Sequence, residues 1–255
     1  MKKSYLLGAF FFTAFSGHVA AENCAYGCPE GGADDIITRP IYTLQNNNAT
    51  KFADWVAYQV TNVTIDGPSR TRTWKADPNL DSADTLEPSD YTGAYATIGT
   101  DRGHQVPLAS FSNTSYWSTT NYLSNITPQA SDLNQGSWVK LETAVRDLAR
   151  TGQDVYVVTG PLYENYFATL PGADESHTIP SGYFKVVITD NSGWVDASAF
   201  ILSQTVSRSA NFCNYEVSID DVELRSGLNI MPDLPSYKES AVEGQTGGLS
   251  SSLGC

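Results

Sequence analysis

The chain of 255 residues has few basic residues, few histidines and few cysteines. Lys and Arg together number 15 against 28 Asp and Glu, so the formal net charge is −13. A protein that holds a polyanion over a broad surface is basic overall, and this composition excludes that mode of binding. Any phosphate chemistry must therefore depend on a small, local cluster of arginines.

Long apolar runs are also absent. The only candidate, Leu6–Phe15, follows two lysines and falls short of the roughly 18 residues that a membrane span requires. Val19-Ala20-Ala21 then supplies the small residues that signal peptidase prefers. The pattern predicts a secretory signal peptide at residues 1–21, with a membrane anchor as the alternative. Residues 22–255 are expected to be exported, to have no contact with a membrane, and to form one domain.

The four cysteines all lie in the expected mature chain, at Cys24, Cys28, Cys213 and Cys255. An even number in an exported chain favours disulfides over catalysis. Three pairings are possible, and the simplest joins Cys24 to Cys28 and Cys213 to Cys255. Loop-closure entropy gives about 2 kcal/mol for the first and about 4 kcal/mol for the second. A zinc site is the alternative for the first pair, although only two cysteines are local and no histidine is near.

Strand-like runs are short and bounded by turn-forming residues. They occur at Trp55–Val60, Val155–Val158, Phe184–Ile188 and Ala197–Leu202. Residues 22–50 are rich in Asn, Gly and Pro, and they are expected to form a loop-rich arm held by the first disulfide.

One helical pattern is strong. Apolar residues recur at i, i+3, i+7 and i+10 over Trp138–Leu148, and Gly152 follows as a stop. A weaker helix is expected at Ile219–Arg225, and the Gly- and Ser-rich tail Glu239–Gly254 is expected to be tethered by the last cysteine. There is no internal repeat and no linker between two cores. The pattern predicts a single α+β domain of antiparallel strands with one principal central helix.

The scarcity of histidine narrows the search for a general base. His18 belongs to the expected signal, and His177, beside Thr178-Ile179-Pro180, is expected to be structural. His104 ends the segment Asp101-Arg102-Gly103-His104, which places a guanidinium, a flexible glycine and an imidazole within four residues. An imidazole with an ordinary pKa of about 6.5 can accept a proton at neutral pH, which makes His104 the candidate base.

Polar motifs continue into the predicted helix. Asn125-Ile126-Thr127-Pro128-Gln129 precedes Asp132–Trp138, and Glu142 and Arg146 then lie four residues apart on one helical face. Taken alone, this last pair would be interpreted as a surface ion pair of small energetic value.

Together these motifs resemble the DNA/RNA non-specific endonucleases with a ββα-metal core. The likeness is specific because the Asp-Arg-Gly-His segment is followed at the right distance by Asn-Ile-Thr-Pro-Gln and Leu-Asn-Gln-Gly-x-Trp. It spans most of the expected mature chain and weakens after about Asp190. The segments that carry it are Asn23–Pro29, Thr71–Lys75, Asp84–Leu86, Asp90–Ala94, Asp101–His104, Tyr122–Gln129, Leu133–Trp138 and Thr159–Glu164.

The resemblance implies roles for individual residues. His104 would be the general base, Asn134 the direct ligand of Mg²⁺, and Glu142 the holder of one of the ion's waters. Arg72, Arg102 and Arg146 would contact the scissile phosphate, while Asn125 and, more weakly, Gln129 would support the site. Because Mg²⁺ dehydrates reluctantly and takes few protein ligands, one amide oxygen plus waters is a reasonable shell, and Mn²⁺ is expected to substitute.

The spacing of two of these residues raises a geometric question. On one straight helix, Asn134 and Glu142 would be about 12 Å apart along the axis, too far to ligate one ion directly. Either Gly136 places Asn134 before the regular helix or Glu142 acts through water. A water-mediated role for Glu142 is compatible with either geometry, so Glu142 is expected to bind the ion through water.

The sequence therefore predicts a secreted endonuclease that cuts single- and double-stranded DNA and RNA with little sequence preference and leaves 5′ phosphates. The resemblance also suggests a homodimer. The alternatives are an enzyme restricted to RNA or to DNA, a nucleic-acid binding protein with a dead site, and a structural or adhesive exported protein. Because the acidic surface should repel polyanions until salt screens it, with a Debye length of about 8 Å at roughly 0.15 M, activity is expected to tolerate or prefer moderate salt.

Overall fold

Antiparallel strands dominate the fold of this computed structural model, which describes residues 23–255. A seven-stranded sheet has the order β1-β2-β3-β6-β7-β8-β9, and a second sheet pairs β4 with β5. The predicted signal peptide lies outside the described residues. The strands are β1 (Ile36–Arg39), β2 (Tyr42–Asn47), β3 (Phe52–Val60), β4 (Thr100–His104), β5 (Ile126–Ala130), β6 (Val155–Leu162), β7 (Gly182–Asn191), β8 (Trp194–Ser203) and β9 (Glu216–Val217).

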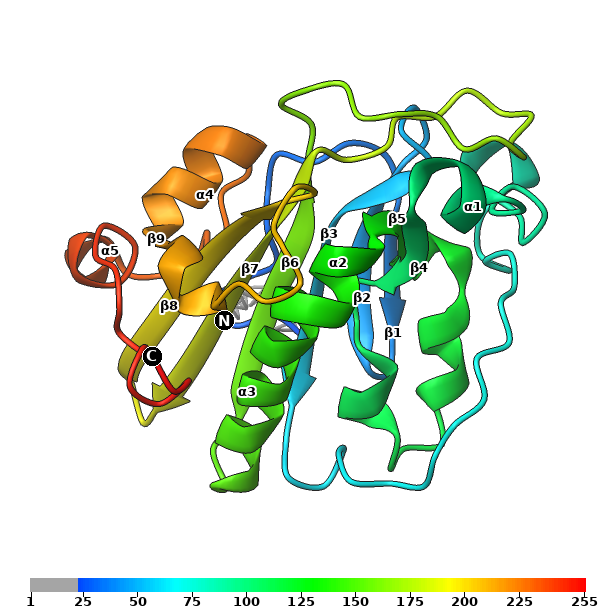
Figure 1. Ribbon diagram of the computed structural model, residues 1–255. Coiled ribbons are helices and arrows are strands. Elements are labelled where there is room, and N and C mark those ends of the chain that lie inside the picture. Colours follow the sequence, from blue (N-terminus) through cyan, green and yellow to red (C-terminus); the bar gives the residue numbers. More distant parts are fainter. Residues whose placement is uncertain (1–22) are drawn as a thin grey trace, which may run out of the picture.

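Helices cover both faces of the large sheet. The α-helices of residues 23–255 are α1 (Ala94–Ile98), α2 (Ser131–Leu133), α3 (Val139–Arg150), α4 (Ile219–Ser226) and α5 (Ser236–Val242). In Figure 1, α3 (green) crosses in front of the sheet, β4 and β5 lie to its right, and α4 and α5 (orange to red) lie at the left. The prediction of an α+β domain with one principal helix is confirmed.

The core forms two layers because neighbouring strand residues point to opposite faces of the sheet. Val157 and Val187 pack on the α3 side, with Leu141 of α3. Val158 and Val186 pack on the other side, in the cluster that includes α4 and α5. Since both faces are buried, β6, β7 and β8 contain nearly continuous apolar runs, and for this reason their central segments were recognisable in the sequence.

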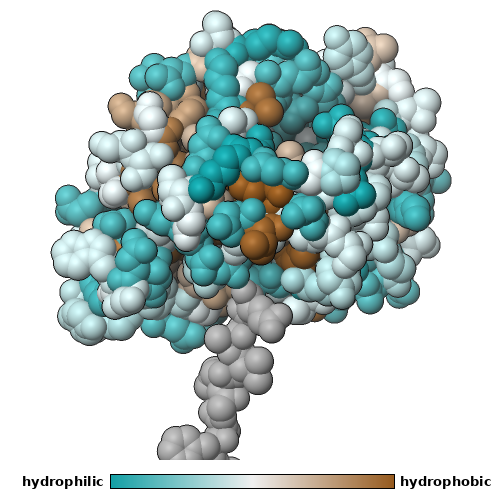
Figure 2. Space-filling view, turned by 90° about the horizontal axis from the view of Figure 1, so that it is seen from below, coloured by the Kyte–Doolittle hydropathy of each residue, from teal (hydrophilic) through white to brown (hydrophobic). Residues whose placement is uncertain are grey.

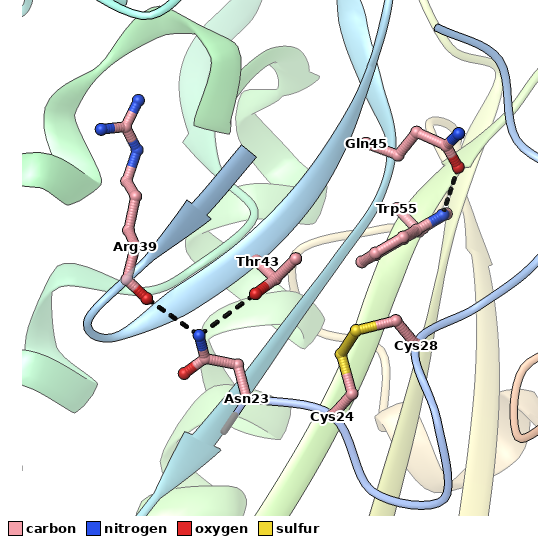
Figure 3. Close-up of a disulfide and its surroundings, with 7 residues drawn as sticks. All are labelled: Asn23, Cys24, Cys28, Arg39, Thr43, Gln45 and Trp55. Carbon is pink, nitrogen blue, oxygen red and sulfur yellow. Dashed lines mark hydrogen bonds between the residues drawn. A yellow bond between two sulfur atoms is a disulfide. The ribbon is translucent and has the colours of Figure 1, made fainter. Parts of the chain in front are cut away.

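The N-terminal region differs from the prediction. The prediction of a loop-rich arm at residues 22–50 is wrong, because β1 and β2 pair with each other and β2 pairs with β3. Asn23, the first described residue, contacts this hairpin: its Nδ2 donates to the carbonyl of Arg39 (2.9 Å) and to Thr43 Oγ1 (3.2 Å) (Figure 3). Nearby, Trp55 Nε1 donates to Gln45 Oε1 at 2.8 Å.

Both disulfides form as predicted, Cys24 with Cys28 and Cys213 with Cys255. The first packs on the face of the sheet that α4 and α5 cover, in the same cluster as Trp55 (Figure 3). The second fixes the last residue of the chain. The tail expected at Glu239–Gly254 is more regular than its composition suggests, because its first residues complete α5.

The face of the molecule seen from below is mostly hydrophilic, with apolar residues confined to small areas (Figure 2). Within residues 23–255, no helix is long and apolar enough to cross a membrane.

Candidate active site

A cleft of about 950 Å³ opens beside β4 and the start of α3. It is lined by six of the residues that the sequence singled out, which come from four separate segments: Arg72, Arg102, His104, Asn134, Glu142 and Arg146. β4 supplies Arg102 and His104 and pairs antiparallel with β5, which leads through α2 and a π-type turn, Asn134–Trp138, into α3. β4 and α3 therefore both line this cleft, and β5 supports β4 by pairing with it.

Gly136 answers the geometric question raised by the sequence. Its φ and ψ are −111° and −111°, so the chain bends there and Asn134 precedes the regular helix. A Cβ at this position would lie 2.6 Å from both Cα and the carbonyl oxygen of Arg208, so only glycine permits the close approach of that segment. The bend allows Asn134 and Glu142 to line one cleft although eight residues separate them.

Asn134 has a fixed side chain and a free oxygen. Its Nδ2 donates to Asp101 Oδ2 at 2.8 Å, and no residue within 23–255 donates a hydrogen bond to its Oδ1. Asp101 is itself held by Ser131 and Gln135, whose side chains donate to it at 2.8 Å each. Such a carboxylate orients the amide so that its oxygen is available to a ligand. A hard cation such as Mg²⁺ takes oxygen donors of this kind, so the residues fit the metal.

His104 is held from one side. Its Nε2 lies 3.2 Å from Asn121 Oδ1, and its ring centroid lies 5.2 Å from that of Trp74. A carbonyl oxygen can only accept, so this contact places the hydrogen on Nε2 and leaves Nδ1 as the acceptor. Burial lowers the pKa of His104 to about 4; the hydrogen bond with Asn121 partly opposes this shift, and the charge of Arg72 adds to it. The imidazole is therefore uncharged at neutral pH.

Asn125 and Gln129 lie behind the cleft. Asn125 is fully buried; its Oδ1 accepts from the Val106 amide at 2.8 Å, and its Nδ2 donates to the carbonyls of Val106 (3.2 Å) and Thr120 (2.8 Å). These bonds tie the segment that follows His104 to the segment that contains Asn121. Gln129 is also buried and lies against Gly103. A Cβ added to Gly103 would lie 2.5 Å from Gln129 Oε1.

The arginines of the cleft differ from most others in the protein. Elsewhere, Arg39, Arg150, Arg208 and Arg225 each pair with a carboxylate. Arg72, Arg102 and Arg146 form no ion pair with any residue between 23 and 255.

Two of these three side chains are nevertheless oriented by neutral groups. Arg102 Nη2 donates to the Pro88 carbonyl at 3.1 Å, and its guanidinium lies 5.1 Å from the ring centroid of Tyr91. Arg146 Nη2 donates to Thr143 Oγ1 at 2.8 Å. Arg102 Nε and Arg146 Nη1 have no hydrogen-bond partner within the described chain. The cleft thus offers oriented donors that form no ion pair with a carboxylate of residues 23–255.

A buried lysine lies beneath the cleft. Lys185 of β7 has no exposed surface; its Nζ donates to the Tyr58 hydroxyl at 3.1 Å and lies 4.6 Å from the ring centroid of Trp138. Burial lowers the pKa of Lys185 to about 8, and Glu142 opposes that shift. Burial raises the pKa of Glu142, and Lys185 leads the positive charges that oppose this. The lysine therefore favours the charged form of a carboxylate at the cleft wall.

Sequence reasoning did not identify Asn121, Asp101, Trp74 or Lys185 as site residues. Asp101 lies inside the Asp-Arg-Gly-His segment, which was a usable signal. The sequence carries no such signal for Asn121 or Lys185, because the role of each depends on a partner that only folding brings near. His177 is structural as predicted, since its Nε2 accepts from the Leu170 amide at 2.9 Å and its Nδ1 lies 2.9 Å from the Glu175 carbonyl.

Comparison with known proteins agrees with this geometry. The family model described as DNA/RNA non-specific endonuclease matches residues 19–236. A protein named Nuclease from Serratia marcescens is 47% identical over 260 residues, which cover 99% of this chain and 97% of that protein. Human mitochondrial Endonuclease G is 30% identical over 230 residues, which cover 84% of this chain and 74% of that protein.

A solved structure, described as the EndoG/EndoGI complex, has a similar fold. It matches with a TM-score of 0.73 and 22% identity, over 87% of this chain and 94% of that chain. At this identity the likeness concerns the fold alone.

Proposed function

Because the chain belongs to the DNA/RNA non-specific endonuclease family and is a hydrolytic endonuclease, we propose that His104 and the surrounding cleft residues cut the backbones of DNA and RNA by attack of water. One observation carries the proposal. A single cleft holds an uncharged imidazole with a free acceptor nitrogen, an amide oxygen free of hydrogen bonds, and three arginines that pair with no carboxylate of residues 23–255.

His104 acts as the general base. With Nε2–H bound to Asn121, the Nδ1 lone pair takes a proton from water as the water oxygen bonds to phosphorus. The bond from phosphorus to the 3′ oxygen breaks on the opposite side, and the leaving oxygen takes a proton from a water molecule. The products are a 3′ hydroxyl and a 5′ phosphate.

The arginines bind the phosphate. Arg72, Arg102 and Arg146 direct charge-assisted hydrogen bonds to its non-bridging oxygens, where negative charge grows during attack. Because nearby groups already orient Arg102 and Arg146, less side-chain entropy is lost when the substrate binds. This local cluster replaces the basic surface that the protein lacks.

Asn134 would hold Mg²⁺ through Oδ1, with Asp101 fixing the amide and Glu142 binding one of the ion's waters. When bound, the ion neutralises phosphate charge and stabilises the leaving 3′ oxygen. Mn²⁺, which accepts similar oxygen donors, would substitute. Because water is the nucleophile and the 2′ hydroxyl takes no part, DNA and RNA should both be cut.

The test uses purified protein with plasmid DNA and with RNA, first in chelator and then with Mg²⁺ or Mn²⁺ restored. Both substrates should be cut only when a metal is present. His104→Ala should lower turnover at least about 100-fold while weak substrate binding persists. His177→Ala is the matched control, because it removes the other histidine of the described chain, and it should keep most of the activity. Cleavage of RNA alone would contradict the non-specific claim, and unchanged cleavage by His104→Ala would exclude His104 as the base.

Export is a further part of the proposal. The lysines and apolar run of residues 1–21 support it, and so do the two disulfides, which persist in oxidising compartments. The exported protein should begin at Glu22, which N-terminal sequencing would check. A homodimer stays a prediction, for sedimentation velocity to test.

A further inference from the structure

Three carboxylates converge on the face of the large sheet that α3 does not cover. Asp220 and Glu223 lie on α4, and Glu243 directly follows α5. One carboxylate oxygen from each residue lies within 4.8 Å of the others. None of the three lines the active-site cleft.

Glu243 is the unusual member of this acidic triad (Asp220, Glu223 and Glu243). The residue is only 7% exposed, yet no residue within 23–255 forms a hydrogen bond or an ion pair with its carboxylate. Its backbone is fixed, because its carbonyl accepts from the amides of Ile219 (2.9 Å) and Asp220 (3.2 Å). The fold therefore holds a largely buried side chain with its carboxylate near two others, and no group of residues 23–255 pairs with that carboxylate.

Among the described residues, no basic side chain forms an ion pair with the triad. Arg225, on the same helix, pairs with Glu164, and Lys238 Nζ donates to the Gly193 carbonyl at 2.6 Å. Burial, with the neighbouring carboxylates Glu223, Glu239 and Asp220, raises the pKa of Glu243 to about 7. Because like charges at this spacing repel one another, a proton or a cation would stabilise the site.

We propose that Asp220, Glu223 and Glu243 bind a divalent cation of the calcium class. Oxygens within 4.8 Å of one another can surround one ion at the 2.3–2.6 Å bond lengths that Ca²⁺ prefers. Ca²⁺ accepts carboxylates in irregular geometry and binds six to eight oxygens, so waters would complete the shell. Glu223 can contribute one oxygen while its Oε1 accepts from the Ile230 amide at 2.7 Å.

A second acidic group, Glu87, Asp90, Asp174 and Glu175, has weaker support. Its buried member, Asp90, already accepts a hydrogen bond from the Glu87 amide at 2.6 Å. Its other members are half-buried or exposed. The triad differs because Glu243 is largely buried and its carboxylate has no hydrogen-bond partner among residues 23–255.

The ion would fasten the end of α5 to α4. Glu243 lies beyond the family-model match, which ends at residue 236, whereas Asp220 and Glu223 lie within it. The expected consequence is calcium-dependent stability of the C-terminal region rather than a change in catalysis.

The test measures Ca²⁺ binding by calorimetry and thermal unfolding after treatment with chelator. The full chain carries Asn134→Ala throughout, so that the cleft contributes as little as possible. Ca²⁺ should bind and raise the Tm of this parent. Adding Glu243→Gln should weaken binding at least about tenfold and remove most of the rise in Tm. Adding Asp221→Asn is the matched control, because it removes an exposed carboxylate of α4 outside the triad, and it should keep both effects.

A second comparison separates a cation site from a merely structural carboxylate. In chelator, Glu243→Gln should be at least as stable as the parent, because the buried charge is gone, while in Ca²⁺ it should be the less stable protein. If Glu243→Gln folds poorly, Asp220→Asn, on an exposed side chain, provides the same comparison. The proposal would be overturned if Ca²⁺ did not change the Tm of the parent, or if Ca²⁺ raised the Tm of Glu243→Gln as much as that of the parent. Neither result bears on the nuclease mechanism.

Discussion

Replacing Lys185 by Met removes a fully buried charge beneath the cleft while keeping a side chain of similar length. Burial lowers the pKa of this lysine from 10.5 to about 8. Between these two values the unfolded chain binds more protons than the folded protein, so the charge on Lys185 costs stability below pH 8 and the cost is relieved as pH rises. At about 1.4 kcal/mol per pKa unit, the parent should gain about 2 kcal/mol over Lys185→Met between pH 7 and pH 9.5.

Urea unfolding of both proteins at pH 7, 8.5 and 9.5 measures this difference. Lys140→Met removes an exposed lysine of α3 and should show no such dependence on pH. If the difference between the parent and Lys185→Met stays constant with pH, Lys185 is not a buried lysine of lowered pKa.

A functional readout accompanies the stability measurement. Lys185 opposes the rise in the pKa of Glu142, so its loss should move the acid limb of kcat/KM to higher pH. An acid limb that stays in place would separate Lys185 from the site.

Three further predictions concern the cleft. The His104 imidazole should titrate near pH 4 in nuclear magnetic resonance spectra, and a midpoint near pH 6.5 would contradict its burial. The stability that its neutral form contributes should be present above about pH 6.5 and should be lost as pH falls toward 4. Asp101→Ala should weaken Mg²⁺ activation about 10- to 100-fold because the Asn134 amide loses its support, whereas Ser131→Ala should change it little; equal curves for the two variants would refute the orienting role. The cleavage rate should rise or hold from very low salt to roughly 0.15 M NaCl, and a steady fall from the lowest salt upward would show that surface repulsion is unimportant.

The parts of the fold that were predictable are those in which local pattern and burial agree. The centres of β3, β6, β7 and β8 are apolar because both faces of the sheet are covered, and α3 shows its apolar stripe because one side faces the core. β1 and β2 were missed because they are short and mix apolar with polar residues, so their turn-forming neighbours dominate the composition. Their pairing stabilises them more than their own preferences do.

The site residues that could be predicted are likewise those that a local sequence pattern marks. His104 and the cleft arginines were found from the local motifs, from the scarcity of histidine and from the family resemblance. Lys185 could not be found, because within Phe184–Ile188 it looks like the one solvent-facing position of a strand. Its partner Tyr58 lies 127 residues away in the sequence. Asn121 was missed for a similar reason, since its contact with His104 exists only after the intervening chain folds.

The pairing of the arginines also bears on how such a protein can adapt. Most of those outside the cleft pair with carboxylates, while Arg102 and Arg146 inside it are held by a carbonyl, a hydroxyl and an aromatic ring. Acidic substitutions elsewhere on the exterior can therefore accumulate without removing the groups that hold the substrate. Total charge and substrate grip are separable traits here, and selection for a saline medium can change one while it leaves the other in place.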